Sequence, residues 1–347
     1  MMIEKFLVGT YTKHQSQGIY QIELDTDKKE LQNAELVAKA GSPTYVAESK
    51  AHKVYAIDKE LKNDKTVGGL LAFDSANIPF KEIQDVTEEG SSPAYVTVDE
   101  LHQNVYTANY HTGNVHVFKI NDDGTLTETD RIHDIGEVGP RPEQASGPHP
   151  HYIDLTYDNR IAVCDLGLDK VYLYDLSDQG KLHLVSETTM DPGFGPRHIQ
   201  FVEKTGKAYL VGELSSKLAV LVNAETGELA VQQIVSTIPA EWTSHNGAAA
   251  IRISNDNRFV YVSNRGNDSL AVFEIQEDGN VKLIQLISIE GEFPRDFTFN
   301  SDQKFVVAVN QNTNNATLYQ RNVDTGKLAM IQKGFSVPEG TCVMLRK

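Results

Sequence analysis

The stretch PAYVTVDELHQNVYTANYHTGNVHVFKINDDGTLTETD, residues 93–130, decides the fold. It contains three runs of alternating apolar residues, then a DDGT turn and a more polar fourth segment. Alternation with a period of two residues is typical of β-strands, and a short glycine-containing turn between such runs is typical of a hairpin. The stretch therefore predicts four consecutive antiparallel strands.

The same unit recurs along the whole chain, and no stretch has helical periodicity. Segments resembling the first strand of this unit are PTYVAE (43–48), PAYVTV (93–98), PHYIDL (150–155), PRHIQF (196–201), AAAIRI (248–253), PRDFTF (294–299) and GTCVML (340–345). They begin about 50 residues apart, a period found in propeller proteins. All but the last are followed by patterns for the second, third and fourth strands.

The chain ends supply the strands that the last copy lacks. The N-terminal segments KFLVGT (5–10), GIYQIEL (18–24) and LQNAELVAK (31–39) match the second, third and fourth strands. We therefore predict that residues 1–347 form a single all-β domain, a seven-bladed β-propeller of four-stranded antiparallel blades. Its last blade is closed by both chain termini, which protects sheet edges. Residues 133–147 are predicted to be an insertion that forms a loop over one face.

The charge balance limits the class of ligand. The chain has 48 acidic and 32 basic residues and a formal net charge of -16. Such a charge argues against nucleic acid or an anionic membrane as a partner. An anionic small molecule would need a local cluster of arginine or lysine. The oligomeric state is not predicted.

The cysteines and the N-terminus indicate the compartment. Cys164 and Cys342 both lie in strand-like runs and fit neither a disulfide framework nor a zinc motif, so we predict two buried, reduced thiols. The N-terminal sequence MMIEKFLVGTYT lacks a secretory apolar region, and the chain has no long apolar run. We expect a cytoplasmic protein.

Propeller geometry brings distant residues together. The start of the innermost strand and the end of the second strand of each blade lie at the same face, beside the central channel. The positions after the repeat proline hold Thr44, Ala94, His151, Arg197, Ala249, Arg295 and Thr341. The positions just past the second strand hold Tyr11, Lys59, Tyr110, Leu166, Glu213, Arg265 and Gln311.

Five of these side chains are candidates for a functional site. His151, Arg197, Glu213, Arg265 and Arg295 are expected to converge on one side of the ring. Three arginines exceed what one glutamate can pair with, which favours an anionic ligand bound by planar guanidinium groups. The alternative is structural, with Arg197 and Glu213 as an ion pair within one blade.

Three further histidines lie near the starts of inner strands. His149 and His245 are candidates for substrate binding. His198 follows Arg197 directly, so strict alternation would point it to the other side of the strand, to pack between blades. Because the cluster is rich in arginine, we predict no metal site and no cofactor.

Several motifs resemble one enzyme family. GPHPH (147–151), GPRH (195–198), SNRGNDS (263–269) and FPRDF (293–297) resemble the bacterial propeller-type 6-phosphogluconolactonases, whose group includes the fungal carboxymuconate lactonising enzymes. The resemblance spans nearly the whole chain and implies a seven-bladed propeller. By motif it assigns the family's site to His151, Arg197, Glu213 and Arg265. One departure is Gly212, where the family often has asparagine before the glutamate.

The resemblance implies hydrolysis of 6-phosphoglucono-δ-lactone to 6-phosphogluconate in the oxidative pentose phosphate pathway. Histidine titrates near neutrality, so His151 is the favoured base, with Glu213 orienting it or serving as the base. Either Arg197 or Arg265 would face the oxyanion, and the others, with Arg295, the phosphate. No Gly-x-Ser-x-Gly motif is present, which favours direct attack by water. The alternatives are a carboxymuconate-type lactonising cycloisomerase and a non-catalytic interaction propeller.

Overall fold

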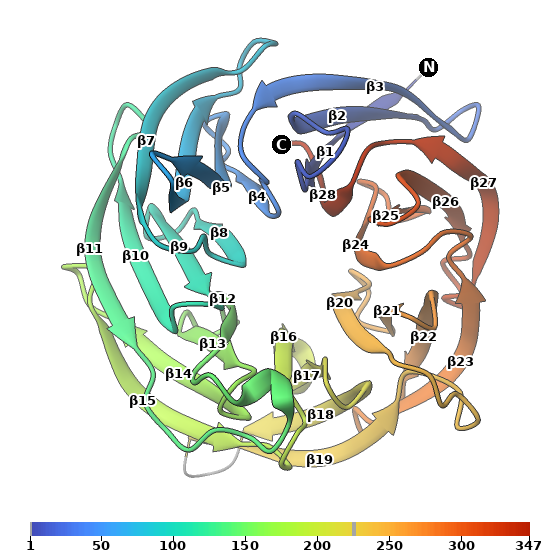
Figure 1. Cartoon of the computed structure of the whole chain (residues 1–347). Coiled ribbons are helices and arrows are strands. Elements are labelled where there is room, and N and C mark those ends of the chain that lie inside the picture. The colour runs from blue at the N-terminus through green and yellow to red at the C-terminus, as the bar shows by residue number, and fades with distance from the viewer. Residues whose placement is uncertain (1, 224–226) are drawn as a thin grey trace.

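The computed structural model describes residues 2–223 and 227–347. Within these ranges the chain forms a ring of seven four-stranded antiparallel sheets (Figure 1). In each sheet the four strands follow one another outward from the central channel. The first strand of each repeat unit lies innermost (Figure 1). The predicted seven-bladed propeller is confirmed.

The strands are given blade by blade, innermost strand first. They are β4 (Val46–Glu48), β5 (Lys53–Lys62), β6 (Lys65–Asp74), β7 (Lys81–Glu89); β8 (Tyr95–Asp99), β9 (Asn104–Asn109), β10 (Asn114–Ile120), β11 (Leu126–His133); β12 (Pro150–Leu155), β13 (Ile161–Asp165), β14 (Lys170–Leu176), β15 (Leu182–Thr189); β16 (Pro196–Val202), β17 (Lys207–Gly212), β18 (Lys217–Asn223), β19 (Leu229–Ser236); β20 (Gly247–Ile253), β21 (Phe259–Arg265), β22 (Ser269–Ile275), β23 (Val281–Ser288); β24 (Pro294–Phe299), β25 (Phe305–Asn310), β26 (Asn315–Arg321), β27 (Leu328–Ser336); and β28 (Gly340–Leu345), β1 (Ile3–Thr10), β2 (Gly18–Asp25), β3 (Glu30–Lys39). Two short 3-10 helices, η1 (Pro142–Gln144) and η2 (Glu203–Thr205), complete the elements of the described residues.

A repeated hydrogen bond locks several blades to the next one. The second strands carry fully buried tyrosines, which pack in the apolar core between sheets. The hydroxyl of Tyr55 donates to the carbonyl of Gly124 at 3.0 Å, in the turn between the outer strands of the following blade. Tyr209 and Tyr261 make the equivalent bonds to the glycines of the EDGN and DTGK turns. The same turn glycines that mark the repeat in the sequence therefore also accept these contacts.

The ring closes on a blade built from both ends of the chain. The C-terminal strand β28 pairs antiparallel with β1, and β2 and β3 complete the sheet (Figure 1). Glu339, just before β28, accepts backbone N–H groups from four consecutive residues, Lys13 to Ser16, at 3.0 to 3.1 Å. This carboxylate therefore ties the loop between β1 and β2 to the C-terminal segment.

We expect Glu339→Gln to lower the free energy of unfolding at pH 7 by about 1–3 kcal/mol, because a neutral amide offers one acceptor oxygen in place of two charged ones. Burial would raise the pKa of Glu339, but the four N–H donors outweigh it and lower the pKa. A lowered folded-state pKa gives stability that is present above the usual glutamate pKa of about 4.3 and is lost as the pH falls through the folded value. In urea unfolding, the difference in free energy of unfolding between wild type and Glu339→Gln should therefore be present at pH 7 and should narrow towards about pH 3. Glu35→Gln, on the exposed side of β3, is the control; an equal gap at both pH values would contradict a role for the charge of Glu339.

The remaining expectations from the sequence concern the insertion, the thiols and membrane spans. Residues 134–149 leave β11 and cross toward the channel by way of η1, and the amide of Gln144 anchors them by donating to the carbonyl of Leu166 at 2.8 Å. Cys164 and Cys342 are free and buried, as predicted. Among the described residues, no helix has the length and apolar character needed to cross a bilayer.

Candidate active site

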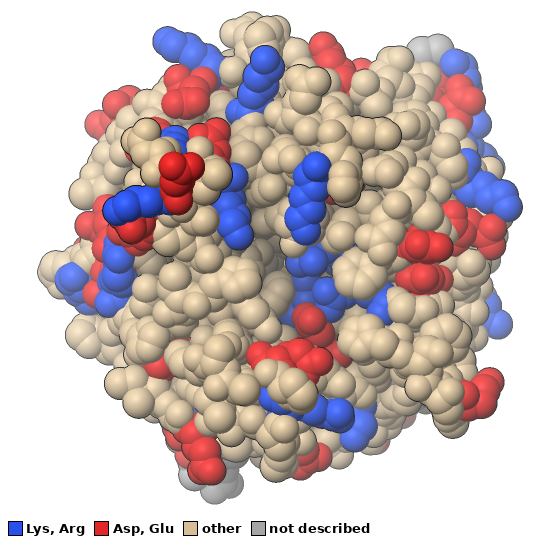
Figure 2. Space-filling view, viewed as in Figure 1, with Lys and Arg blue, Asp and Glu red and all other residues tan. Residues whose placement is uncertain are grey.

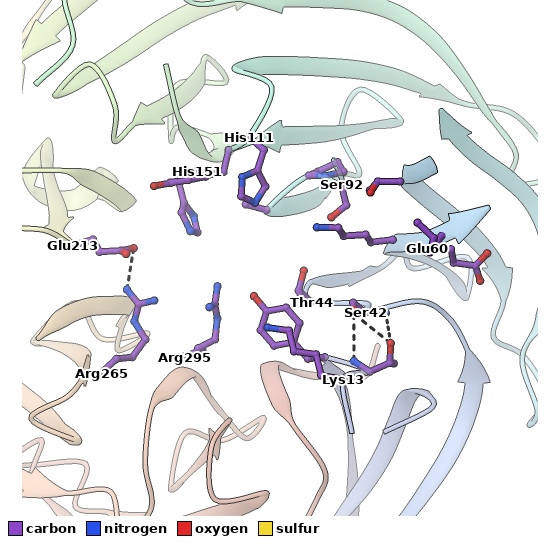
Figure 3. Close-up of a pocket in the computed structure, with 18 residues that line it drawn as sticks. Lys13, Ser42, Thr44, Glu60, Ser92, His111, His151, Glu213, Arg265 and Arg295 are labelled. Carbon is purple, nitrogen blue, oxygen red and sulfur yellow. Dashed lines mark hydrogen bonds and ion pairs between the residues drawn. The ribbon is translucent and has the colours of Figure 1, made fainter. Parts of the chain in front are cut away.

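A pocket of about 630 Å³ opens at the mouth of the central channel, at the face where the inner strands begin. His151, Glu213, Arg265 and Arg295 line it (Figure 3). Arg197, the fifth predicted residue, is buried next to the pocket and contacts Glu213. Figure 2 shows lysine and arginine side chains gathered around the central hollow of this face. The volume is that of a small-molecule site.

Bulges at the starts of the inner strands aim these side chains. In β12, Pro150 pairs with Asp165 and Tyr152 with Cys164, so His151 is an extra residue without a ladder partner. The same register shift makes Arg197 the extra residue of β16 and Arg295 that of β24. A bulge interrupts the alternation of side chains, so the extra residue and the one after it can both face the channel. The residue after the repeat proline therefore reaches the site.

Glu213 is held between two buried guanidinium groups. Its Oε2 lies 2.8 Å from Nε of Arg197 and 2.9 Å from NH2 of Arg265 (Figure 3 shows the contact with Arg265). The two arginine side chains are only 3% and 6% exposed, whereas Glu213 is 21% exposed. The predicted convergence of these three residues is thus an ion-paired triad that presents the carboxylate edge to the pocket.

Backbone carbonyls of β20 fix both arginines. Arg197 donates from NH1 to the carbonyl of Ala249 at 2.8 Å. Arg265 donates from Nε to Gly247 at 3.1 Å and from NH2 to Ala248 at 3.3 Å, and its guanidinium packs over the ring of Phe293. Within the described chain, NH1 of Arg265 makes no hydrogen bond, so it is the guanidinium nitrogen available to a ligand.

The triad keeps all three of its charges at neutral pH. Burial would raise the pKa of Glu213, but the charges of Arg265 and Arg197 outweigh it and lower the pKa to about 2. Burial and the charge of Arg265 lower the pKa of Arg197 to about 9, which leaves its guanidinium protonated at pH 7. The net charge of the triad is therefore positive.

His151 faces this positive charge as a neutral imidazole. It is 6% exposed, and its Nδ1 is enclosed without a hydrogen-bond partner among the described residues. Burial, then the charge of Arg197, lowers the pKa of His151 well below its usual value. With Nδ1 enclosed, Nε2 is the ring nitrogen that can meet a ligand. In the described chain no hydrogen bond joins His151 to Glu213. Oε2 of Glu213 is instead paired with the two arginines.

The prediction for His198 is wrong. Its ring does not pack between blades but lies in the channel beneath the site, 5.2 Å from the rings of Tyr95 and Tyr152 and 5.4 Å from that of His151. Tyr95 and His198 belong to the blades of β8 and β16, which are not neighbours, so their side chains can meet only at the axis of the propeller. The reason is the bulge at Arg197, which breaks the alternation on which the prediction was based. Nε2 of His198 accepts a hydrogen bond from NH1 of Arg197 at 3.1 Å, so His198 supports the triad from below.

Two other candidate histidines lie outside the main pocket. His149 is buried; its Nδ1 donates to the carbonyl of Tyr110 at 2.5 Å, its Nε2 lies 3.0 Å from Oγ of Ser146, and its ring stacks on that of Tyr110. These contacts tie the insertion to the neighbouring blade. His245 is exposed and lines a smaller adjoining pocket of about 240 Å³, which shares Glu213 and Arg265 with the main one.

The family is decided by the whole sequence. Residues 5–345 match the sequence profile of the family described as Lactonase, 7-bladed beta-propeller. The chain belongs to this family. A Bacillus subtilis (strain 168) protein named 6-phosphogluconolactonase is 42% identical to this propeller lactonase over 345 residues, covering 97% of this chain and 96% of that protein. The resemblance stated from the motifs is confirmed.

Solved structures agree with this family assignment. The crystal structure of a Lactobacillus plantarum protein superposes on this propeller lactonase with a TM-score of 0.96, at 52% identity and with 100% of each chain covered. The periplasmic gluconolactonase of Pseudomonas aeruginosa superposes with a TM-score of 0.89, at 25% identity and with 99% of each chain covered.

Two lysines of the lactonase pocket were not among the candidates selected from the sequence. Lys13 and Lys59 line it, together with the aromatic ring of Tyr11. Lys59 and Tyr11 occupy the same repeat position as Glu213 and Arg265, so the signal that identified those two residues also marks these. Lys13 lies two residues past that position, in a loop whose path no periodicity defines. Hydroxyl groups of Ser42, Thr44 and Ser92, at or next to repeat prolines, also face the pocket.

The arrangement suits acyl transfer better than metal chemistry. A neutral imidazole and a free guanidinium nitrogen face one cavity, which supplies a proton acceptor and a fixed positive charge. Among residues 2–223 and 227–347, no three His, Cys, Asp or Glu side chains are grouped to hold a metal ion.

Proposed function

We propose that this propeller lactonase hydrolyses 6-phosphoglucono-δ-lactone to 6-phosphogluconate. The observation that carries the proposal is the pocket that neutral His151 shares with the available NH1 of Arg265, beside an ion-paired carboxylate. The name of the Bacillus subtilis relative supports the same substrate. The partner is thus a small anionic sugar lactone rather than a nucleic acid or a membrane.

The reaction follows from the two groups. A water molecule attacks the lactone carbonyl while Nε2 of His151 accepts its proton, and the carbonyl oxygen becomes an oxyanion next to NH1 of Arg265. When the intermediate collapses, the bond from the carbonyl carbon to the ring oxygen breaks. The imidazolium returns its proton to that oxygen, which leaves as the product's hydroxyl group. No covalent enzyme intermediate is needed.

Glu213 acts through the arginines in this scheme. Two guanidinium groups hold Oε2 of Glu213 and lower its pKa, whereas the imidazole of His151 makes no hydrogen bond in the described chain, so we assign the base role to His151. Arg197 does not line the pocket, and its contacts with Glu213 and His198 suit a residue that positions its neighbours. Arg295, which repeat position placed at the channel, is left to bind the phosphate. The cytoplasmic location expected from the N-terminal sequence matches such a pathway enzyme and stays a prediction.

We expect purified protein to hydrolyse 6-phosphoglucono-δ-lactone faster than the spontaneous reaction, and Arg265→Gln to lower kcat/KM by roughly 10²–10³-fold. The reason is that glutamine keeps a polar side chain but removes the positive charge from the oxyanion. Base uptake at fixed pH measures the rate, with the rate in buffer subtracted.

Arg258→Gln, an exposed arginine of the same blade, is the charge-matched control and should keep the wild-type rate. If wild-type protein gives only the spontaneous rate on this lactone, the proposed function is wrong. If Arg265→Gln is as fast as wild type, the oxyanion role belongs to another group.

A further inference from the structure

The charge of the pocket is opposite to that of the protein. The chain carries -16, yet the pocket is lined by four cations, Lys13, Lys59, Arg265 and Arg295, and two carboxylates. Both carboxylates have cationic partners: Glu213 pairs with the buried arginines, and Glu60 lies 3.6 Å from Nζ of Lys62. The lining therefore retains an excess of positive charge, which attracts an anionic ligand.

Three of the four cations have no acidic partner in the described part of the chain. These are Lys13, Lys59 and Arg295, for which no carboxylate lies within ion-pair distance. Nζ of Lys13 lies 4.1 Å from the centre of the Tyr11 ring, and the guanidinium of Arg295 lies 5.7 Å from the same ring. One aromatic ring thus holds two cations close together, and the mutual repulsion of these cations would be relieved by an anion between them.

The unpaired cations and the reactive groups occupy different parts of the ring. Arg295, Lys13 and Lys59 come from three consecutive blades, those of β24, β28 and β4. His151, Glu213 and Arg265 come from the three blades of β12, β16 and β20. Figure 3 shows Glu213 and Arg265 at one end of the pocket, Lys13 and Ser42 towards the other, and Arg295 between them. The pocket therefore has a reacting end and a cationic end.

A phosphorylated lactone needs such a division. Its carbonyl carbon and the carbon that carries the CH₂–phosphate arm flank the ring oxygen, so one binding pose must place the two groups at separate sites. We propose that Lys13 and Lys59, together with Arg295, form the phosphate subsite and make the enzyme selective for phosphorylated over unphosphorylated lactones. This rests on the proposed function, because it names the part of the substrate that the cationic end recognises.

The adjoining pocket is the less suitable place for the phosphate. It is lined by Arg141, Arg265 and His245, but Glu143 and Glu213 also line it. Its volume is about 240 Å³, against about 630 Å³ for the main pocket. A dianion there would meet Glu143, for which no cation lies within ion-pair distance in the described residues, whereas at the cationic end it would meet only Glu60, which already has Lys62 as a partner.

The test compares one double variant on two substrates. We expect Lys13→Gln/Lys59→Gln to lower kcat/KM for 6-phosphoglucono-δ-lactone by roughly ten- to hundredfold, mainly through KM, since charge-assisted contacts to phosphate are lost. The rate on unphosphorylated glucono-δ-lactone should stay within about twofold of wild type. Lys28→Gln/Lys65→Gln, which removes two exposed lysines from the same blades, is the control and should change neither rate. Arg141→Gln tests the adjoining pocket.

Titration calorimetry with 6-phosphogluconate and with gluconate measures binding without turnover. The double variant should bind 6-phosphogluconate more weakly than wild type, by a similar factor, and should bind gluconate with unchanged affinity. The subsite is overturned if both lactones lose rate equally, if neither does, or if Arg141→Gln alone removes the preference for phosphate. If wild-type protein hydrolyses neither lactone, the proposed function fails, and the two titrations by themselves support or overturn the subsite.

Discussion

His151→Gln is expected to lower the enzyme-dependent rate of lactone hydrolysis by roughly 10²–10⁴-fold, because it removes the general base. The fold should remain, since His151 is an extra residue in a bulge and no hydrogen bond holds its Nδ1 in the described chain. Glutamine has a similar size and polarity but does not accept a proton near neutral pH. Initial rates at fixed pH, with the spontaneous rate subtracted, measure the loss, and thermal unfolding checks the fold.

The pH profile gives a second test of the same role. Burial and the charge of Arg197 lower the pKa of His151, so the imidazole stays neutral and basic well below pH 6.5, the usual value for histidine. The acid limb of kcat/KM for the free enzyme should therefore lie clearly below about pH 6.5. In His151→Gln that limb should be absent from the small residual rate.

One further variant and one control test whether His151 or Glu213 is the base. His183→Gln, an exposed histidine on the outer strand β15, should keep the wild-type rate. Glu213→Gln should also be slow, because it leaves Arg197 and Arg265 without their carboxylate. Wild-type activity in His151→Gln with a large loss in Glu213→Gln would transfer the base role to the glutamate. Wild-type activity in both variants would show that the active site does not lie at this face of the propeller.

Deleting residues 340–347 is expected to abolish cooperative folding. These residues include β28, the innermost strand of the closing blade, which pairs with β1. Cys342 and Val343 are 2% and 1% exposed, and the hydroxyl of Thr341 donates to carbonyls of Gly9 and Thr44 on two adjacent blades. Each large apolar side chain loses about 1.5–3 kcal/mol of burial, and the total with the lost ladder approaches the whole stability of about 5–15 kcal/mol of a typical domain.

The deletion also leaves β1 with an open edge, which favours aggregation. Circular dichroism melts and size-exclusion chromatography should show no sharp transition and no compact monodisperse species. Removing Lys347 alone is the control, because it lies beyond β28 and should leave the transition cooperative. A truncated chain that melts like the full chain would show that β28 is not needed for closure.

The sequence by itself determined the architecture. Strand alternation is a local property with a period of two residues, and its repetition about every 50 residues leaves few folds other than a ring of equal blades. The last repeat copy has only its first strand, GTCVML, and the N-terminal segments match the three strands that it lacks. This implied closure by both chain ends. Repeat position also grouped His151, Glu213, Arg265 and Arg295, which all line one pocket, because equivalent corners of a ring face the same channel.

Only the tertiary structure decided where each side chain at a corner points. The bulges at His151, Arg197 and Arg295 add one residue to a strand, and a pattern with period two carries no sign of that extra residue. For this reason the alternation predicts the wrong side of the strand for His198. The position of Arg197 beside the pocket likewise depends on the carbonyl of Ala249 in the next blade.

The partners of the remaining residues also come from distant parts of the chain. His149 is held by Tyr110, 39 residues earlier, and the loop that carries Lys13 is held by Glu339, 326 residues later. The first contact forms only when two consecutive blades pack together, and the second forms only when the two chain ends meet in the closing blade. The sequence therefore determined which positions meet at the channel, and the packing of closed blades determined which of them bind, which react and which support.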